Sequence, residues 1–263
     1  MKYLLFVLLL FSVVLLAYCF YYARWQSLWA LDNPFQSYEI NHHQDDTLRI
    51  VFIGDSWAGM HSDFDNFMTT EFENNCASPV LFESKGKGGE KTKGIYHLMF
   101  EDGPNGTKSL LSTGPDYCII SAGINDAAAN LGTRQYCHYY LQILDLLLKN
   151  HIHPVILEVP NVDLWLMLGE KPIMDLASDY MKAMMTGCGM YNYQEYREAL
   201  TAMLKSEGLM EHVLFIPMKE WNGDGIDINK SLFLEDRIHL NKEGYESLDS
   251  CIAKNIAIDY NYR

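Results

Sequence analysis

The sequence predicts an α/β protein built around a parallel sheet of about five strands. Five short apolar runs, rich in Val, Ile and Phe, have the length and composition of buried strands. These runs are residues 48–53, 80–82, 117–120, 154–159 and 213–216. Segments with apolar residues at helical spacing separate them, and strands that alternate with helices form parallel sheets.

The predicted helices lie between the strands and at the end of the chain. Their apolar residues recur at the spacing that places side chains on one face of a helix. These core-facing residues are Phe64, Phe67, Met68 and Phe72, then Tyr139, Ile143, Leu146 and Leu147, then Tyr196, Leu200 and Leu204, and last Tyr245, Leu248 and Ile252. Residues 161–190 are irregular and rich in Met, Leu and Trp. We interpret them as an insertion that forms a lid, a docking surface or an ordinary packed helical excursion.

The amino-terminal segment differs from the rest of the chain. Residues 3–23 are apolar and uncharged, and about 20 such residues span a bilayer. We interpret residues 1–25 as an uncleaved signal anchor, with a cleaved signal peptide as the alternative, because no good small-residue cleavage site follows. Residues 26–46 are the expected linker, and residues 47–263 fit one domain. The domain is therefore expected to be periplasmic or extracellular and membrane-anchored, or secreted after cleavage.

Charge and cysteine spacing narrow the classes of partner. The formal net charge is −14, whereas a nucleic-acid partner requires a basic patch. The same charge argues against broad docking on anionic lipid. The six cysteines have no zinc-ligand spacing, and we expect neither a metal nor a cofactor. Export can pair some of the five cysteines that follow Cys19, and buried free thiols are the alternative. The sequence gives no oligomeric state.

Reactive side chains follow three of the predicted strands. Ser56 comes just after the first, Asn125 after the third, and Asp236 with His239 after the fifth. The carboxyl ends of parallel strands meet at one edge of a sheet, where open α/β sheets bind their ligands. We therefore expect these groups to converge, although residues 54–56 or 236–239 alone are equally well explained as helix caps or turns.

This set of side chains is what acyl transfer requires. A serine hydroxyl needs a base, which His239 can provide, and Asp236 can orient the imidazole and stabilise its charged form. The oxyanion needs donors placed in advance. We assign this role to the Asn125 amide and to the backbone N–H groups of Ser56 and Gly89. Trp57, beside the serine, is expected to narrow an acyl pocket or stack on a sugar, with core packing as the alternative.

Two other known motifs, the phosphate-binding loop and the nucleophile elbow of α/β-hydrolases, do not match this sequence. The basic, glycine-rich segment 85–92 resembles a phosphate-binding loop, but Glu90 stands where that motif needs a glycine. Residues 54–58 also depart from the Gly-x-Ser-x-Gly elbow of α/β-hydrolases, because Ala58 replaces the second glycine.

In its motifs the chain resembles the SGNH hydrolase superfamily, also called the GDSL-like lipase/acylhydrolase family. The matching blocks are Gly54-Asp55-Ser56, Gly123-Ile124-Asn125-Asp126 and Asp236-Arg237-Ile238-His239. Gly89 is the best match for the oxyanion glycine of the remaining block, with Gly88 as the alternative. The resemblance covers about residues 48–257. It implies a flavodoxin-like, three-layer α/β/α fold and metal-free ester hydrolysis.

The expected function is therefore that of a serine esterase with a Ser56, His239 and Asp236 triad. We expect it to act on acyl esters, in particular O-acetyl esters, of a carbohydrate or another small molecule. The alternatives are an O-acyltransferase that modifies an envelope polysaccharide, a lipase or lysophospholipase, and a catalytically silent binding module.

Overall fold

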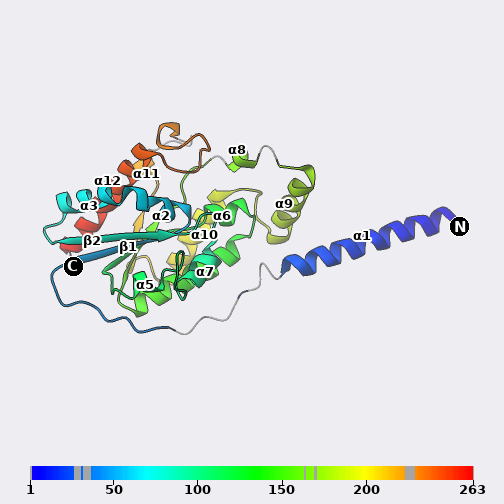
Figure 1. Ribbon diagram of the computed structural model, residues 1–263. Helices are drawn as coiled ribbons and strands as arrows, with labels where there is room; N and C mark the ends of the chain where they lie inside the picture. Colours follow the sequence, from blue (N-terminus) through cyan, green and yellow to red (C-terminus); the bar gives the residue numbers. More distant parts are fainter. Residues whose placement is uncertain are drawn as a thin grey trace. The chain divides into compact units, whose positions relative to one another are not determined.

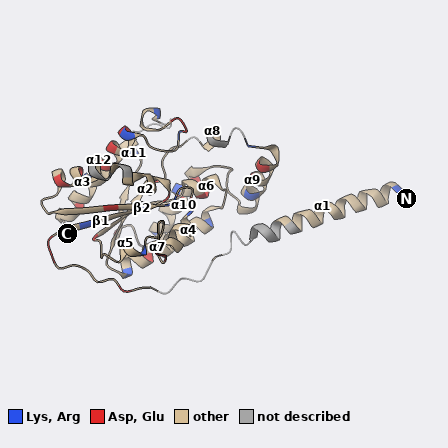
Figure 2. Cartoon of the chain, viewed as in Figure 1, with Lys and Arg blue, Asp and Glu red and all other residues tan. Residues whose placement is uncertain are grey.

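The computed structural model describes residues 2–26, 31, 37–162, 164–168, 171–222 and 229–262. The chain divides into two units, Met1–Phe35 and Gln36–Arg263. The first contains helix α1 (Lys2–Gln26), in which Lys2–Cys19 is apolar enough to cross a membrane. After Lys2, the span to Cys19 contains no Lys, Arg, Asp or Glu, and Figure 2 draws this part of the helix in tan. This helix is consistent with a signal peptide or an anchor, since both have this composition.

The second unit contains the predicted parallel sheet, which confirms the fold class. Its strand order is β2-β1-β3-β4-β5. The strands are β1 (Leu48–Gly54), β2 (Val80–Gly86), β3 (Tyr117–Ser121), β4 (His153–Leu157) and β5 (Leu214–Ile216). Gly54 pairs with Gly86 on one side and with Ser121 on the other, so the carboxyl ends of three neighbouring strands are level.

Helices cover both faces of the sheet. Helices α3 and α12 lie on one face and α4, α7 and α10 on the other (Figure 1). The helices of this unit are α2 (Ser56–His61), α3 (Asp65–Asn75), α4 (Thr92–Leu98), α5 (Lys108–Leu111), α6 (Ile124–Ala128), α7 (Thr133–Lys149), α8 (Leu164–Leu168), α9 (Ile173–Thr186), α10 (Tyr193–Ser206), α11 (Lys219–Asn222) and α12 (Lys242–Tyr262), with 3-10 turns at Ser62–Phe64 and Lys230–Leu232. The fold is thus a three-layer α/β/α sandwich.

The second strand is longer than the sequence predicts. The apolar run ends at Phe82, but β2 continues through Glu83, Ser84 and Lys85 to Gly86. Strand β2 is at the edge of the sheet, and Glu83 is exposed while Phe82 is buried. An edge strand can carry polar side chains towards water, so apolar character alone underestimates its length.

Part of the expected linker packs on the domain. Residues 36–46 belong to the second unit. The His42 imidazole lies 2.6 Å from the Asn150 carbonyl oxygen, and His43 Nε2 lies 3.1 Å from Asp116 Oδ2. These contacts hold the end of the expected linker against the domain. Residues 27–30 and 32–36 of the linker, and residues 223–228 of the loop before the last motif, lie outside the described residues.

The predicted insertion contains α8 and α9, and α9 has an unusual distribution of side chains. Ile173, Met174, Tyr180 and Met184 are exposed, whereas Asp179 is buried. This arrangement is stable because the buried carboxylate has its own donors. They are Lys171 Nζ at 2.6 Å, Lys182 Nζ at 2.7 Å and the Tyr191 hydroxyl at 2.7 Å.

Candidate active site

Ser56 stands at a tight junction between β1 and α2. The strand ends at Gly54, where a Cβ atom would lie 2.2 Å from the Ser121 carbonyl oxygen, so only glycine fits this close approach. Helix α2 starts at Ser56, and Asp55 caps it by accepting a hydrogen bond of 3.0 Å from the Trp57 backbone N–H. The junction therefore fixes the backbone on both sides of the serine.

The structure brings Ser56, His239 and Asp236 together in one chain of hydrogen bonds. His239 Nε2 lies 3.0 Å from Ser56 Oγ, and His239 Nδ1 lies 2.6 Å from Asp236 Oδ2. A carboxylate only accepts, so the Nδ1 position carries the proton. Nε2 is then free to accept from the Ser56 hydroxyl, which is the geometry a general base needs.

The Asp236 carboxylate is held in its charged form. Burial alone would raise its pKa, but the hydrogen bonds from the His239 side chain and from the backbone N–H groups of His239 and Ile238 lower the pKa below its ordinary value. Both N–H groups donate to Asp236 Oδ1 at 2.9 Å. The turn itself is closed by a 2.8 Å hydrogen bond from the Leu234 N–H to the His239 carbonyl. This local geometry explains why an Asp-x-x-His spacing suffices to bring the carboxylate and the imidazole into hydrogen-bond contact.

Asn125 and the glycine-rich segment form the other side of the site. The Asn125 amide donates to the Glu90 carbonyl at 3.0 Å and lies 3.4 Å from Asp55 Oδ2. The amide has two N–H donors, so to donate to an oxyanion it must exchange one of these two acceptors for the new one. Gly89, exposed and with φ at 71°, has the left-handed backbone that favours glycine. Gly88 is exposed as well.

A different glycine, which sequence reasoning did not single out, approaches the serine turn most closely. A Cβ atom on Gly86 would lie 2.3 Å from the Asp55 carbonyl oxygen and 2.6 Å from the Gly59 nitrogen. In contrast, a Cβ atom on Gly88 or Gly89 would meet nothing within 4 Å. The sequence places several glycines in this segment, and only the pairing of β2 with β1 decides which one needs to be small.

Buried carboxylates connect the loops behind these groups. Asp55 is 1 % exposed and accepts from the Ser121 hydroxyl at 2.9 Å, which ties the end of β1 to the end of β3. Burial raises the Asp55 pKa to about 6, against the lowering effect of its hydrogen bonds. Asp126 accepts from the Thr92 N–H and hydroxyl at 3.0 and 2.8 Å, and burial raises its pKa to about 6 as well. Asp55 directly follows an apolar strand, and Asp126 lies in the first turn of the short helix that follows β3; these positions are the signal that marks such residues in a sequence.

Trp57 does not have the role that its position beside Ser56 predicts. It is only 2 % exposed, so it can neither stack on a sugar nor narrow an open acyl pocket. Its ring packs against Trp221, with centroids 5.7 Å apart, and its Nε1 donates to the Ile238 carbonyl at 3.0 Å. Core packing, the alternative interpretation, describes this side chain correctly.

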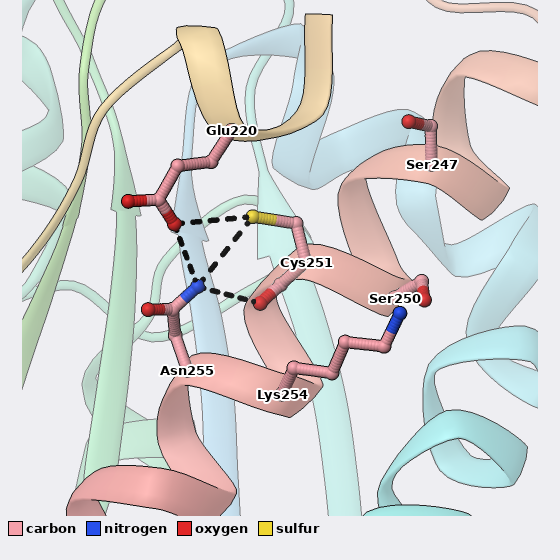
Figure 3. Close-up of a pocket in the computed structure, with 6 residues that line it drawn as sticks. All are labelled: Glu220, Ser247, Ser250, Cys251, Lys254 and Asn255. Carbon is pink, nitrogen blue, oxygen red and sulfur yellow. Dashed lines mark hydrogen bonds between the residues drawn. The ribbon is translucent and has the colours of Figure 1, made fainter.

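Other candidate sites lack the chemistry of the triad. A hollow of about 460 Å³ lies between α11 and α12, and Figure 3 shows Cys251 and Asn255 facing Glu220 there. Burial and the Glu220 charge raise the Cys251 pKa to about 11, so this thiol stays protonated and is a poor nucleophile. All six cysteines are free. Within the described ranges, no cluster of His, Cys, Asp and Glu side chains is arranged to hold a metal.

Solved structures of other proteins have the same fold. The chain is similar in fold to a lipase/acylhydrolase from Enterococcus faecalis, at 15 % identity and a TM-score of 0.59, over 81 % of this chain and 96 % of the other. It is similar to an acetyl xylan esterase, at 15 % identity and a TM-score of 0.53, over 81 % and 99 %. It is also similar to a family 3 carbohydrate esterase from Clostridium thermocellum, at 13 % identity and a TM-score of 0.53, over 81 % and 98 %.

Sequence comparison gives a more specific result than fold comparison. No curated protein matches the chain. The sequence profile of the GDSL-like lipase/acylhydrolase family, however, matches residues 52–246. This range contains Ser56, Asn125, Asp236 and His239, and it covers most of the second unit. The protein therefore belongs to the GDSL-like lipase/acylhydrolase family.

Proposed function

We propose that the protein is a serine esterase that removes acyl groups, in particular O-acetyl groups, from a carbohydrate. The observation that carries this proposal is the continuous contact from Asp236 through His239 to Ser56, with distances of 2.6 and 3.0 Å. A binding module has no need of a serine placed against an oriented imidazole, so the same contact argues against a silent role.

In the proposed reaction His239 Nε2 takes the proton of Ser56 as Oγ attacks the ester carbonyl. The negative charge that develops on the carbonyl oxygen is stabilised by the Asn125 amide and by the N–H groups of Ser56 and Gly89. His239 then gives the proton to the departing alcohol, which leaves an acyl-serine. Water, deprotonated by the same nitrogen, releases the acid and restores Ser56. Asp236 keeps the imidazole in the required tautomer throughout.

The carbohydrate ester is favoured by two of the proteins with the same fold, an acetyl xylan esterase and a carbohydrate esterase. A lipase is the second candidate, because the exposed side chains Ile173, Met174 and Met184 of α9 can contact an apolar substrate. Rates on p-nitrophenyl esters of increasing chain length distinguish the two, since an acetylesterase loses activity beyond short acyl groups. Comparison of the rate of acetate release with the rate of acetyl transfer to an added sugar distinguishes hydrolysis from acyl transfer.

We also propose that α1 anchors the catalytic domain on the outer side of a membrane, where glycan esters are accessible. Its support is the strongly apolar span Lys2–Cys19. Mass spectrometry of the mature amino terminus decides between an anchor, which retains this span, and a signal peptide, which is removed.

The test of the catalytic proposal is replacement of Ser56, with Ser62 as the matched control. Ser62 is exposed at the end of the same short helix, and its hydroxyl donates to the Gly59 carbonyl at 3.1 Å. Ser56→Ala is expected to lower kcat by about 10⁴–10⁶-fold, and Ser62→Ala to leave it unchanged. A fluorophosphonate should label the wild type at Ser56. Labelling of another serine, or full activity in Ser56→Ala, would refute the proposal.

A further inference from the structure

The nucleophile and its base come from separate parts of the chain. Ser56 follows β1, whereas His239 lies in the turn between β5 and α12. The reaction depends on the 3.0 Å separation of their side chains, since a misplacement of about 1 Å can cost about 10²-fold in rate. Some contact therefore has to fix one loop against the other.

The immediate neighbours of these two residues make such a contact. The Trp57 indole N–H donates to the Ile238 carbonyl at 3.0 Å. Trp57 directly follows Ser56, and Ile238 directly precedes His239. Trp57 is 2 % exposed and Ile238 8 %, so water cannot replace the donor. A buried carbonyl left without its partner is costly, which makes this hydrogen bond a firm constraint.

The indole is held in place from three directions. Its ring packs edge-on against Trp221 and lies 6.3 Å from the ring of Phe233. Phe233 forms an isolated bridge with Leu240, next to His239. The Trp57 carbonyl accepts from the Tyr245 hydroxyl of α12 at 3.0 Å. Trp57 thus has a fixed ring and a fixed backbone, and its N–H points at one atom of the histidine turn.

We infer that Trp57 is a positioning residue, whose indole N–H sets the distance between Ser56 Oγ and His239 Nε2. The inference rests on the proposed function and deepens it. Trp57 does not touch the substrate, because it is buried; it acts through the backbone that carries His239. Loss of the N–H should leave substrate binding intact and slow the step in which the proton moves from Ser56 to His239.

The sharpest test compares Trp57→Phe with Trp221→Phe. Both changes remove one indole N–H and part of one buried ring. Trp221 Nε1 is buried without a hydrogen-bond partner among the residues that the structure describes, so the second change breaks no bond. On a small acetyl ester we expect Trp57→Phe to lower kcat about 10- to 100-fold with KM nearly constant. Trp221→Phe should stay close to the wild type in both constants.

Two further measurements separate positioning from loss of folding. Site-specific replacement of Trp57 by 3-benzothienylalanine keeps the two-ring shape and removes only the donor. This variant should lose kcat to the same extent as Trp57→Phe, and it should still unfold in one cooperative transition above the assay temperature, with the melting temperature lowered only by the cost of the unpaired Ile238 carbonyl. The rate of fluorophosphonate labelling at Ser56 should fall in parallel, because it needs the same base.

Each outcome decides the inference. Wild-type kcat and labelling rate in the benzothienyl variant would overturn it. A rise in KM at constant kcat would also contradict it, since that result indicates a substrate contact. If the wild type neither hydrolyses esters nor reacts with the phosphonate, the proposed function itself is wrong, and the role of Trp57 falls with it.

Discussion

Replacement of Asp55 by asparagine tests the electrostatics of the site directly. Asp55 is buried, and its pKa is raised from 3.8 to about 6, chiefly by burial. Between these values the folded protein holds a proton that the unfolded chain releases. The stability that this group contributes is therefore complete below about pH 4 and is lost as the pH rises through 6. Each pH unit of this difference corresponds to about 1.36 kcal/mol, so the loss is at most about 3 kcal/mol.

Asp55→Asn removes this dependence on pH while the Asn oxygen can still accept from the Trp57 N–H and the Ser121 hydroxyl. In the wild type, Asp55 Oδ2 lies 3.4 Å from the Asn125 amide nitrogen. In the variant the new amide nitrogen takes the place of this oxygen and faces the Asn125 nitrogen. This contact adds a cost that does not change with pH. The informative quantity is thus the slope of stability with pH. The stability of the variant relative to the wild type should rise by about 2 kcal/mol between pH 4.5 and 7.5, because about a third of the full effect has already occurred at pH 4.5.

The assay is thermal unfolding of the full chain in non-ionic detergent, followed by tryptophan fluorescence across this pH range. At about 2–4 °C per kcal/mol for a domain of this size, the difference in melting temperature should change by about 4–8 °C. Asp102→Asn, at a side chain that is 70 % exposed, is the control and should track the wild type. A difference between Asp55→Asn and wild type that stays flat with pH would refute the reasoning.

The other predictions concern the donors and the glycines of the site. Asn125→Ala should lower kcat by about 10²–10³-fold with little change in KM, because the oxyanion exists only along the reaction path. A change in KM alone would instead assign the amide to substrate binding. Asp236→Asn should lower kcat/KM by about 10⁴-fold, because the imidazole loses its orienting carboxylate, and a pH–rate profile with an unchanged plateau would argue against that role. Gly86→Ala should destabilise the domain by roughly 1–3 kcal/mol, since its Cβ would lie 2.3 Å from the Asp55 carbonyl oxygen. Gly88→Ala should not destabilise it, and equal melting temperatures of the two variants would contradict the close approach at Gly86.

Local patterns determined much of this protein. Apolar runs such as residues 48–53, separated by amphipathic segments, predicted the parallel sheet, because burial on both faces demands such runs. The end of a strand at Gly54 placed Ser56 at the edge of the sheet. The contact between Asp236 and His239 was also predictable, since it joins two residues only three positions apart within one turn.

The tertiary structure decided what depends on contacts between distant segments. Trp57 and Ile238 are 181 positions apart. No pattern in the sequence predicts that the Trp57 indole is buried in the core and does not face a substrate. The requirement for glycine at position 86 arises because β2 pairs with β1. The raised pKa of Asp55 comes from burial beneath several elements at once. Packing brings these groups together, whereas composition and spacing indicate only the local structure of each segment.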